Sequence, residues 1–201
     1  MTDQLQALPW VVSKNGDQPP TEFLCPTRDV ADGRLPKLYN AAIHHKFSAN
    51  QAALLTALAG ELTANCFDHN LGKWRDISGC WFSFSSLEDQ LHITIADRGQ
   101  GILNSLKQAD SSLASPHDAL VVALTKQISG RQPENRGRGL KFIINALNEH
   151  FTGAKFILRS DDAQFVATAP IETSRIVESI QSNQAAVYGT YAEIVIPPET
   201  K

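Results

Sequence analysis

The stretch Glu61-Leu-Thr-Ala-Asn65-Cys-Phe-Asp68-His69 decides the fold, and we interpret it as the second half of an amphipathic helix. Glu61, Asn65 and His69 recur every four residues, with Asp68 between them, so these side chains crowd one face of the helix. Asn65 and His69 fall inside the arc that the leucines of this helix should bury. Buried polar groups need partners, so the pattern predicts either contacts with neighbouring backbone or a bound ligand.

The central helix is expected to run from about Ala49 to Asn70, after a capping box at Ser48-Ala-Asn-Gln51. A shorter helix is expected within residues 35–47. The first 34 residues contain four prolines and two glycines, which argue against a long helix, and Trp10-Val-Val12 is expected to be extended. We divide the chain into an N-terminal extension, residues 1–44, and one domain, residues 45–201.

Alternation of apolar and polar residues predicts the strands. Residues 80–86 and 91–95 are expected to pair as antiparallel strands, and residues 155–160, 164–169 and 191–197 to form three more. Ser115 and Pro116 have the pattern of an N-cap and a first helical residue, which predicts a helix through about Gln127. A further amphipathic helix is expected after residues 136–141.

Two glycine motifs stand next to these elements. The first, Asp97-Arg-Gly99-Gln-Gly101-Ile102, follows a strand and permits a close approach of the backbone to a flat ligand, although an ordinary turn is an alternative. The second, Arg136-Gly137-Arg138-Gly139-Leu140-Lys141, opens a helix. Its backbone N–H groups and its basic side chains favour anion binding, and a basic loop without a ligand is the alternative.

Composition limits the classes of function. The chain has 201 residues and a formal net charge of -3, which argues against nucleic acid as the main partner because phosphate binding needs a basic patch. No apolar run reaches membrane-spanning length and the N-terminus lacks signal-peptide features, so we expect a cytoplasmic protein without a membrane partner. The three cysteines are widely spaced, and they indicate neither a disulfide framework nor a zinc site.

The order of the motifs carries a resemblance to a known superfamily. Residues 45–198 resemble the nucleotide-binding domain of gyrase, Hsp90, histidine kinases and the MutL-type mismatch-repair ATPases, the GHKL superfamily. The chain is most similar to the small stand-alone members, the anti-sigma-factor serine kinases. Arg98 departs from the superfamily, which often has Asn or a small residue there, and the paired helices that carry the phosphoacceptor histidine of a histidine kinase are not recognisable.

The resemblance implies that ATP and Mg²⁺ are the cofactors. By this resemblance Asn65 binds the metal, Glu61 is the general base, and Asp97 accepts a hydrogen bond from the exocyclic amine of adenine. Thr190, after Gly189, resembles the threonine that shares contacts with the adenine and the aspartate. The remaining expected nucleotide contacts are Gly99, Gly101 and Ile102 near the base and ribose, and Arg136, Gly137, Arg138, Gly139 and Leu140 near the phosphates.

The fold that the resemblance implies is α+β: a two-layer α/β sandwich of the Bergerat type. A mixed, mostly antiparallel sheet would carry helices on one face, with a mobile ATP lid between Ile102 and Arg136. The expected function is an ATP-dependent serine/threonine kinase or slow ATPase that acts on a regulatory protein, a sigma factor or STAS-like protein. An ATP-responsive binding module without catalysis is one alternative, and a gyrase-like or Hsp90-like ATPase fragment, with a homodimer partner, is another.

Overall fold

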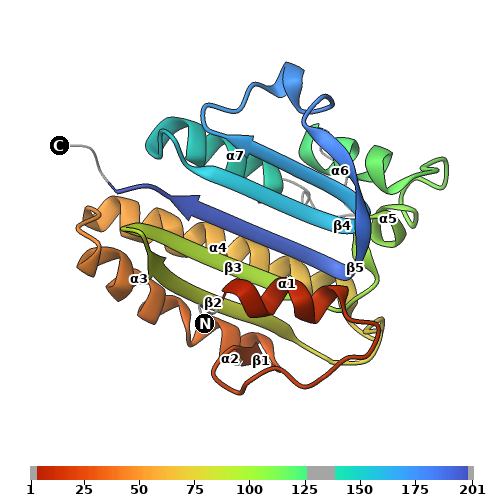
Figure 1. The fold of residues 1–201 in the computed structure, drawn as a ribbon, viewed down its shortest axis with the longest axis horizontal. Coiled ribbons are helices and arrows are strands. Elements are labelled where there is room, and N and C mark those ends of the chain that lie inside the picture. The colour runs from red at the N-terminus through yellow and green to blue at the C-terminus, as the bar shows by residue number, and fades with distance from the viewer. Residues whose placement is uncertain (1–3, 126–138, 199–201) are drawn as a thin grey trace.

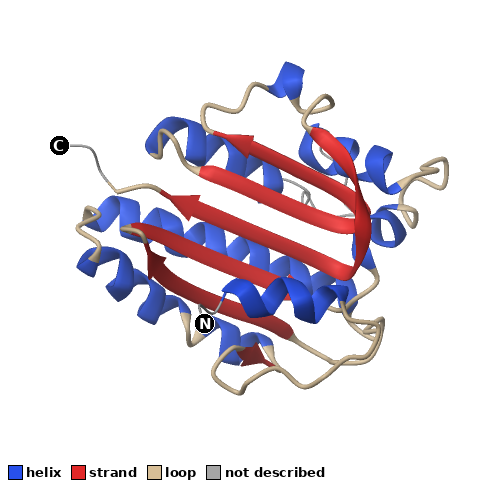
Figure 2. Ribbon diagram, viewed as in Figure 1, coloured by secondary structure: helices blue, strands red, loops and turns tan. Residues whose placement is uncertain are grey.

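A computed structural model describes residues 4–125 and 139–198 of this chain. It has two layers, a five-stranded sheet and a layer of helices, and its class is α+β (Figures 1 and 2). All neighbouring strands pair antiparallel, in the order β1-β2-β3-β5-β4. The strands are β1 (Leu24–Cys25), β2 (Cys80–Leu87), β3 (Gln90–Asp97), β4 (Lys155–Thr168) and β5 (Ile180–Ile196).

The helix layer is built around the long helix α4 (Ala49–Asn70), whose capping box at Ser48 and Gln51 is present as expected. α4 lies behind β2 and β3, with α3 (Leu35–His44) on one side of it and α7 (Gly139–His150) on the other (Figure 1). α6 (Pro116–Thr125) packs against β4 and β5. The remaining short helices are α2 (Arg28–Asp32), α5 (Gly101–Leu106) and the 3₁₀ turn η1 (Thr173–Arg175).

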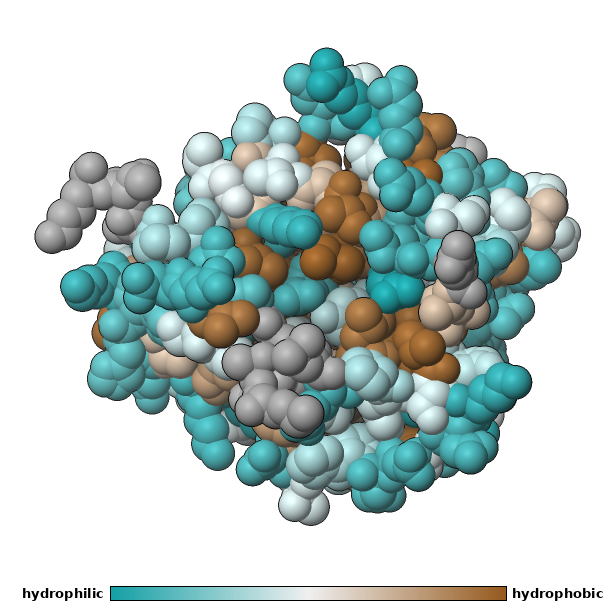
Figure 3. Space-filling model, in the orientation of Figure 1, coloured by the Kyte–Doolittle hydropathy of each residue, from teal (hydrophilic) through white to brown (hydrophobic). Residues whose placement is uncertain are grey.

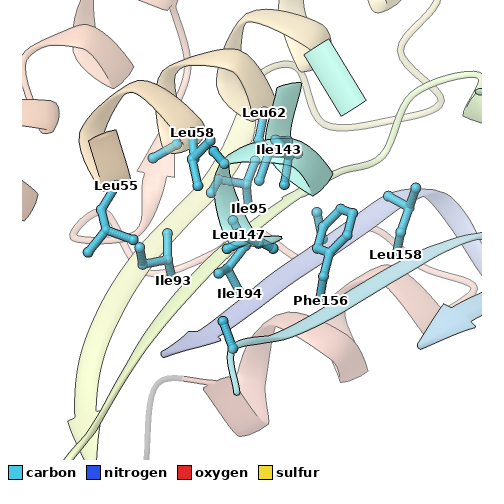
Figure 4. Packing of buried hydrophobic residues seen from close by; sticks show 14 of the residues in the cluster. Leu55, Leu58, Leu62, Ile93, Ile95, Ile143, Leu147, Phe156, Leu158 and Ile194 are labelled. Carbon is cyan, nitrogen blue, oxygen red and sulfur yellow. The ribbon is translucent and has the colours of Figure 1, made fainter. Parts of the chain in front are cut away.

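The core lies between these two layers. Leu55, Leu58 and Leu62 point from α4 toward Ile93 and Ile95 of β3. Figure 4 shows how this contact continues into a single cluster through further side chains of α7, β4 and β5: Ile143, Leu147, Phe156, Leu158 and Ile194. Each of these side chains is at most 4 % exposed, so burial of apolar surface joins α4 and α7 to the sheet.

The N-terminal segment differs from the prediction, because Trp10-Val-Val12 is helical rather than extended. α1 (Gln4–Val12) lies on the sheet face opposite the other helices (Figure 1). Ala7, Trp10 and Val11 recur at helical spacing and are buried against a cluster that includes Trp81 and Tyr191. The burial of this apolar stripe outweighs the cost of Pro9 inside the helix. On this face, hydrophobic surface gathers toward the middle and hydrophilic side chains border it (Figure 3).

The two strands expected at residues 155–160 and 164–169 are present as the two arms of β4. The chain reverses between them at Asp161, where the backbone has φ of 52° and the pairing with β5 shifts register. Backbone hydrogen bonds join Gly153 and Ala154 to Ala169, so the two arms run antiparallel (Figures 1 and 2). β5 is longer than expected.

The segment expected as a lid, between Ile102 and Arg136, is described only as far as Thr125. Its first part folds as α5 and α6, and contrary to our expectation it is well anchored, because Leu120 and Leu124 are buried in the main core. The rest of the expected lid lies outside the described residues.

Candidate functional site

The last turns of α4 and the first residue of α7 lie side by side. Glu61 is exposed and Asn65 is half-buried, whereas Leu58 and Leu62 of the same helix lie in the core. A Cβ added to Gly139 would stand 2.9 Å from Glu61 Oε2 and 3.5 Å from Asn65 Nδ2. The N-terminus of α7, where backbone N–H groups have no partner within the helix, therefore lies beside the carboxylate and the amide of α4. Leu140, the next residue, is half-buried against the core.

The next two polar residues of α4 make contacts within the protein. Asp68 forms an ion pair with Arg28, at 3.2 Å between Oδ1 and Nη1. His69 Nδ1 lies 2.8 Å from the hydroxyl of Ser105, which ties α4 to α5. A cleft opens beside these residues, and it is lined by Asp68, His69, Leu71, Lys73, Gln100, Ser105 and Gln108. The crowded polar face is thus divided: Glu61 and Asn65 lie toward α7, and Asp68 and His69 connect neighbouring elements.

Asp97, at the end of β3, is a buried carboxylate with only 2 % of its surface exposed. Its Oδ1 accepts a hydrogen bond from the backbone N–H of Gly99 at 2.8 Å and one from Asn70 Nδ2 at 2.9 Å. Burial raises the pKa of Asp97 to about 6, against the lowering effect of hydrogen bonds from Gly99, Cys66, Asn70 and Thr190. The carboxylate is therefore mainly ionised at pH 7, in surroundings where an ionised group needs donors.

Asn70 is the residue of this site that sequence reasoning missed. It is the last residue of α4 and is 3 % exposed. Besides its bond to Asp97, its Oδ1 accepts from the backbone N–H of Gln100 at 3.0 Å. Its position just beyond the polar stretch on the same helix was the available signal, since a buried amide at a helix end needs partners from another element.

Gly99 and Gly101 are required by their surroundings. A Cβ at Gly99 would lie 2.0 Å from Asn70 Cγ, so only glycine lets the loop pass over that side chain. Gly101 has φ of 75°, which favours glycine, and it begins α5. Ile102, half-buried, donates its backbone N–H to Ser160 Oγ at 2.9 Å. The glycine motif thus forms a tight connection from β3 to α5.

One row across the sheet brings Asp97 and Thr190 together. Asp97 is the register partner of Thr190 on β5, and Thr190 in turn is the partner of Ser160 on β4. Gly189, with φ of 106°, lies so close to the motif that a Cβ there would stand 2.2 Å from the Asp97 carbonyl oxygen. The expected pair therefore meets, and Ser160 extends the polar row.

The same row continues through cysteines on the other side of Asp97. Cys80 is the register partner of both Asp97 and Cys25, and all three cysteines are buried free thiols. The Cys80 contact lowers the pKa of the Cys66 thiol, but burial together with the nearby Asp97 carboxylate and Cys25 leaves that pKa raised. Hydrogen bonding to Cys66 and burial likewise hold the pKa of Cys80 well above its usual range, although the Cys25 contact lowers it. Thiols that stay protonated at neutral pH are packing residues and weak donors.

Arg98, the residue that follows Asp97, lies on the other face of the sheet. Its side chain is fully buried and donates to both carboxylate oxygens of Asp76, at 2.7 and 2.6 Å. It also donates to the carbonyl oxygens of Trp10 and Ser13, at 2.6 and 2.9 Å, where α1 ends. Arg98 therefore anchors α1 and leaves the environment of Asp97 on the helix side without a guanidinium.

The remaining predicted contacts, Arg136, Gly137 and Arg138, lie outside the described residues. Within residues 4–125 and 139–198, no group of three His, Cys, Asp or Glu side chains could hold a metal ion. Over the same residues, no helix combines the length and the apolar character needed to cross a bilayer.

Comparison with protein families, with curated proteins and with solved structures finds no match for this chain.

Proposed function

We propose that this chain binds Mg-ATP and acts as an ATP-dependent protein kinase or slow ATPase on a regulatory protein partner. The observation that carries the proposal is Asp97. An ionised, buried carboxylate whose Oδ1 is already occupied by Gly99 and Asn70 suits a ligand that donates one hydrogen bond. The exocyclic amine of adenine is such a donor, whereas guanine presents a carbonyl at that position and would leave the carboxylate unpaired.

The residues around Glu61 fit the polyphosphate end of such a ligand. The N-terminus of α7 at Gly139 offers backbone N–H groups to an anion, beside the amide of Asn65. Mg²⁺ prefers oxygen ligands and usually takes several from phosphates and water, so a site with one neutral amide fits Mg²⁺ better than a metal that needs several side chains. Bound Mg-ATP would supply a terminal phosphoryl group whose charge is partly neutralised by the metal.

Glu61 is the residue we propose as general base. Its carboxylate is exposed beside the N-terminus of α7, where it can accept a proton from an attacking water or a side-chain hydroxyl of the partner. A protein that only changes shape with ATP needs no base at this position, which favours the enzyme over the binding-module alternative. A gyrase-like or Hsp90-like fragment receives less support, because α1 packs on its own sheet.

The experiment is phosphoryl transfer from γ-labelled Mg-ATP, measured with proteins recovered on the immobilised chain. Glu61→Ala should keep ATP affinity within a few fold and lose about 10²-fold of turnover, since a base acts in the transition state. Asn65→Ala should instead lose the Mg²⁺-dependent part of ATP binding. Unchanged turnover of Glu61→Ala with the recovered partner would replace the kinase proposal with the binding module.

A further inference from the structure

The end of α4 holds Asp97 in one arrangement through a single side chain. Asn70 Nδ2 donates to Asp97 Oδ1 at 2.9 Å, and Asn70 Oδ1 accepts from the backbone N–H of Gln100 at 3.0 Å. The opposite orientation of the amide would set its oxygen against a carboxylate and its NH₂ against an N–H group. Its two partners therefore determine the orientation of the Asn70 side chain.

This arrangement distinguishes the two oxygens of Asp97. Oδ1 receives Asn70 Nδ2 and the Gly99 N–H, both within the loop that carries the glycine motif. Gly99 packs so tightly on Asn70 that no side chain fits between them. The carboxylate plane is thereby fixed, and the side chains of Cys66 and Thr190 add further hydrogen bonds to it.

We propose that Asn70 is a positioning residue that fixes the plane of the Asp97 carboxylate and keeps it ionised for the adenine amine. The inference rests on the proposed function, and it adds the residue on which nucleotide selectivity and its pH dependence rely. Asn70 acts through Asp97 and makes no contact of its own with the ligand.

The surroundings of Asp97 make this donor important. Among the described residues, the titratable groups that face Asp97 are the Cys66 thiol of α4 and the Cys80 thiol of β2, and their raised pKa values keep both neutral at pH 7. Arg98 directs its charge to the opposite face. Gly99, Cys66 and Thr190 remain as donors, and losing Asn70 should move the pKa of Asp97 upward from about 6.

The test compares two variants of Asn70 with the parent by calorimetric titration of Mg-ATP between pH 5.5 and 9. Asn70→Leu keeps the volume and removes the donor. We expect about tenfold weaker binding at pH 7 that recovers as pH rises, because the ionised form of Asp97 returns. Asn70→Asp keeps the shape, and its protonated form can donate the same hydrogen bond. Its binding should therefore stay near that of the parent at low pH and weaken as pH rises.

Asn104 supplies the matched control. It donates to the backbone carbonyl of the same Gln100 at 2.9 Å but does not bond to Asp97. Asn104→Leu and Asn104→Asp should follow the parent at every pH, which also cancels the titration of the phosphates. Equal losses in both Asn70 variants at all pH values would mean that Asn70 is only structural and would overturn the inference.

Carbon-13 titration of the Asp97 carboxyl in the ligand-free protein separates this inference from the proposed function. Asn70→Leu should raise the Asp97 pKa, and an unchanged pKa overturns the role of Asn70 whatever binds. If the parent binds no Mg-ATP at any pH, the proposed function fails, while a raised Asp97 pKa in Asn70→Leu still establishes that Asn70 keeps this carboxylate ionised.

Discussion

Asp97 is a buried carboxylate that is costly to ionise in the folded chain. Its carboxyl is 2 % exposed and its pKa is about 6, so the ionised form is less favourable in the folded chain than in water. Folded proteins keep such a group where a ligand, a reaction or a specific contact uses it. The hydrogen bonds from Gly99 and Asn70 reduce the cost without removing it.

The pKa of Asp97 predicts how stability depends on pH. The folded pKa, about 6, is above the ordinary value of 3.8, so the folded state holds the proton more tightly than the unfolded state. Its contribution is complete below pH 4 and is lost as pH rises through 6, by about 3 kcal/mol of unfolding free energy. Urea denaturation at several pH values should show the free energy of unfolding falling more steeply with pH in the parent than in Asp97→Asn. The control Asp32→Asn, at an exposed position, should show the same pH dependence as the parent. If Asp97→Asn also showed the parent's pH dependence, the raised pKa of Asp97 would be contradicted.

At the scale of elements, the sequence predicted those features that depend on residues close together in the chain. The capping box of α4 and the pairing of β2 with β3 depend on neighbouring residues, and both were expected from the sequence. Glu61, Asn65, Asp97 and Thr190 were predicted as site residues from their spacing and order. Asn70 was not, because its role depends on Gln100 and Asp97, which reach it only through the tertiary fold.

α1 is an element that the sequence did not predict. The prolines and glycines of the first 34 residues suggested an irregular segment, but the helix is stabilised by contacts of Trp10 with residues more than 70 positions away, at Trp81 and Arg98. Such long-range burial outweighs local propensity. Arg98, taken from the sequence as a departure from the superfamily pattern, is explained by these contacts.

Arg98 therefore gives a prediction about α1. Arg98→Met should lower the unfolding free energy by about 3 kcal/mol, because it leaves the carboxylate of Asp76 and two backbone carbonyls without their donor. Hydrogen exchange should show early loss of protection in α1. Arg175→Met removes an exposed ion pair, with side chains 72 % and 60 % exposed, and should change stability by less than about 0.5 kcal/mol. Undiminished protection of α1 in Arg98→Met would refute the anchoring role.

At the scale of the whole molecule, one continuous core holds the site together. α4 and α7, which carry Glu61, Asn65 and Gly139, are joined to β3 and β5, which carry Asp97 and Thr190, by the cluster around Leu58 and Ile95 (Figure 4). The general α+β architecture followed from the sequence, whereas the long β5 and the short helix α5 depend on packing that no short pattern encodes.

A substitution at Leu58 tests whether the core between α4 and β3 stabilises the fold. Leu58→Ala should lower the unfolding free energy by about 3 kcal/mol, because Leu58 is fully buried and the substitution leaves a cavity. Leu71, 78 % exposed, is the control, and Leu71→Ala should change stability by less than about 0.5 kcal/mol. Equal stability of the two variants in thermal denaturation would show that the α4–β3 contact does not support the fold.

The affinity of the parent for Mg-ATP and for Mg-GTP, measured by calorimetry at pH 7.5 beside Asp97→Asn, tests the central claim most directly. We predict that ATP binds at least about tenfold more tightly than GTP, and that Asp97→Asn weakens ATP at least about tenfold because it loses a charge-assisted hydrogen bond. Equal affinity of the parent for the two nucleotides, or no binding of either, would contradict the assignment of Asp97 and the function built on it.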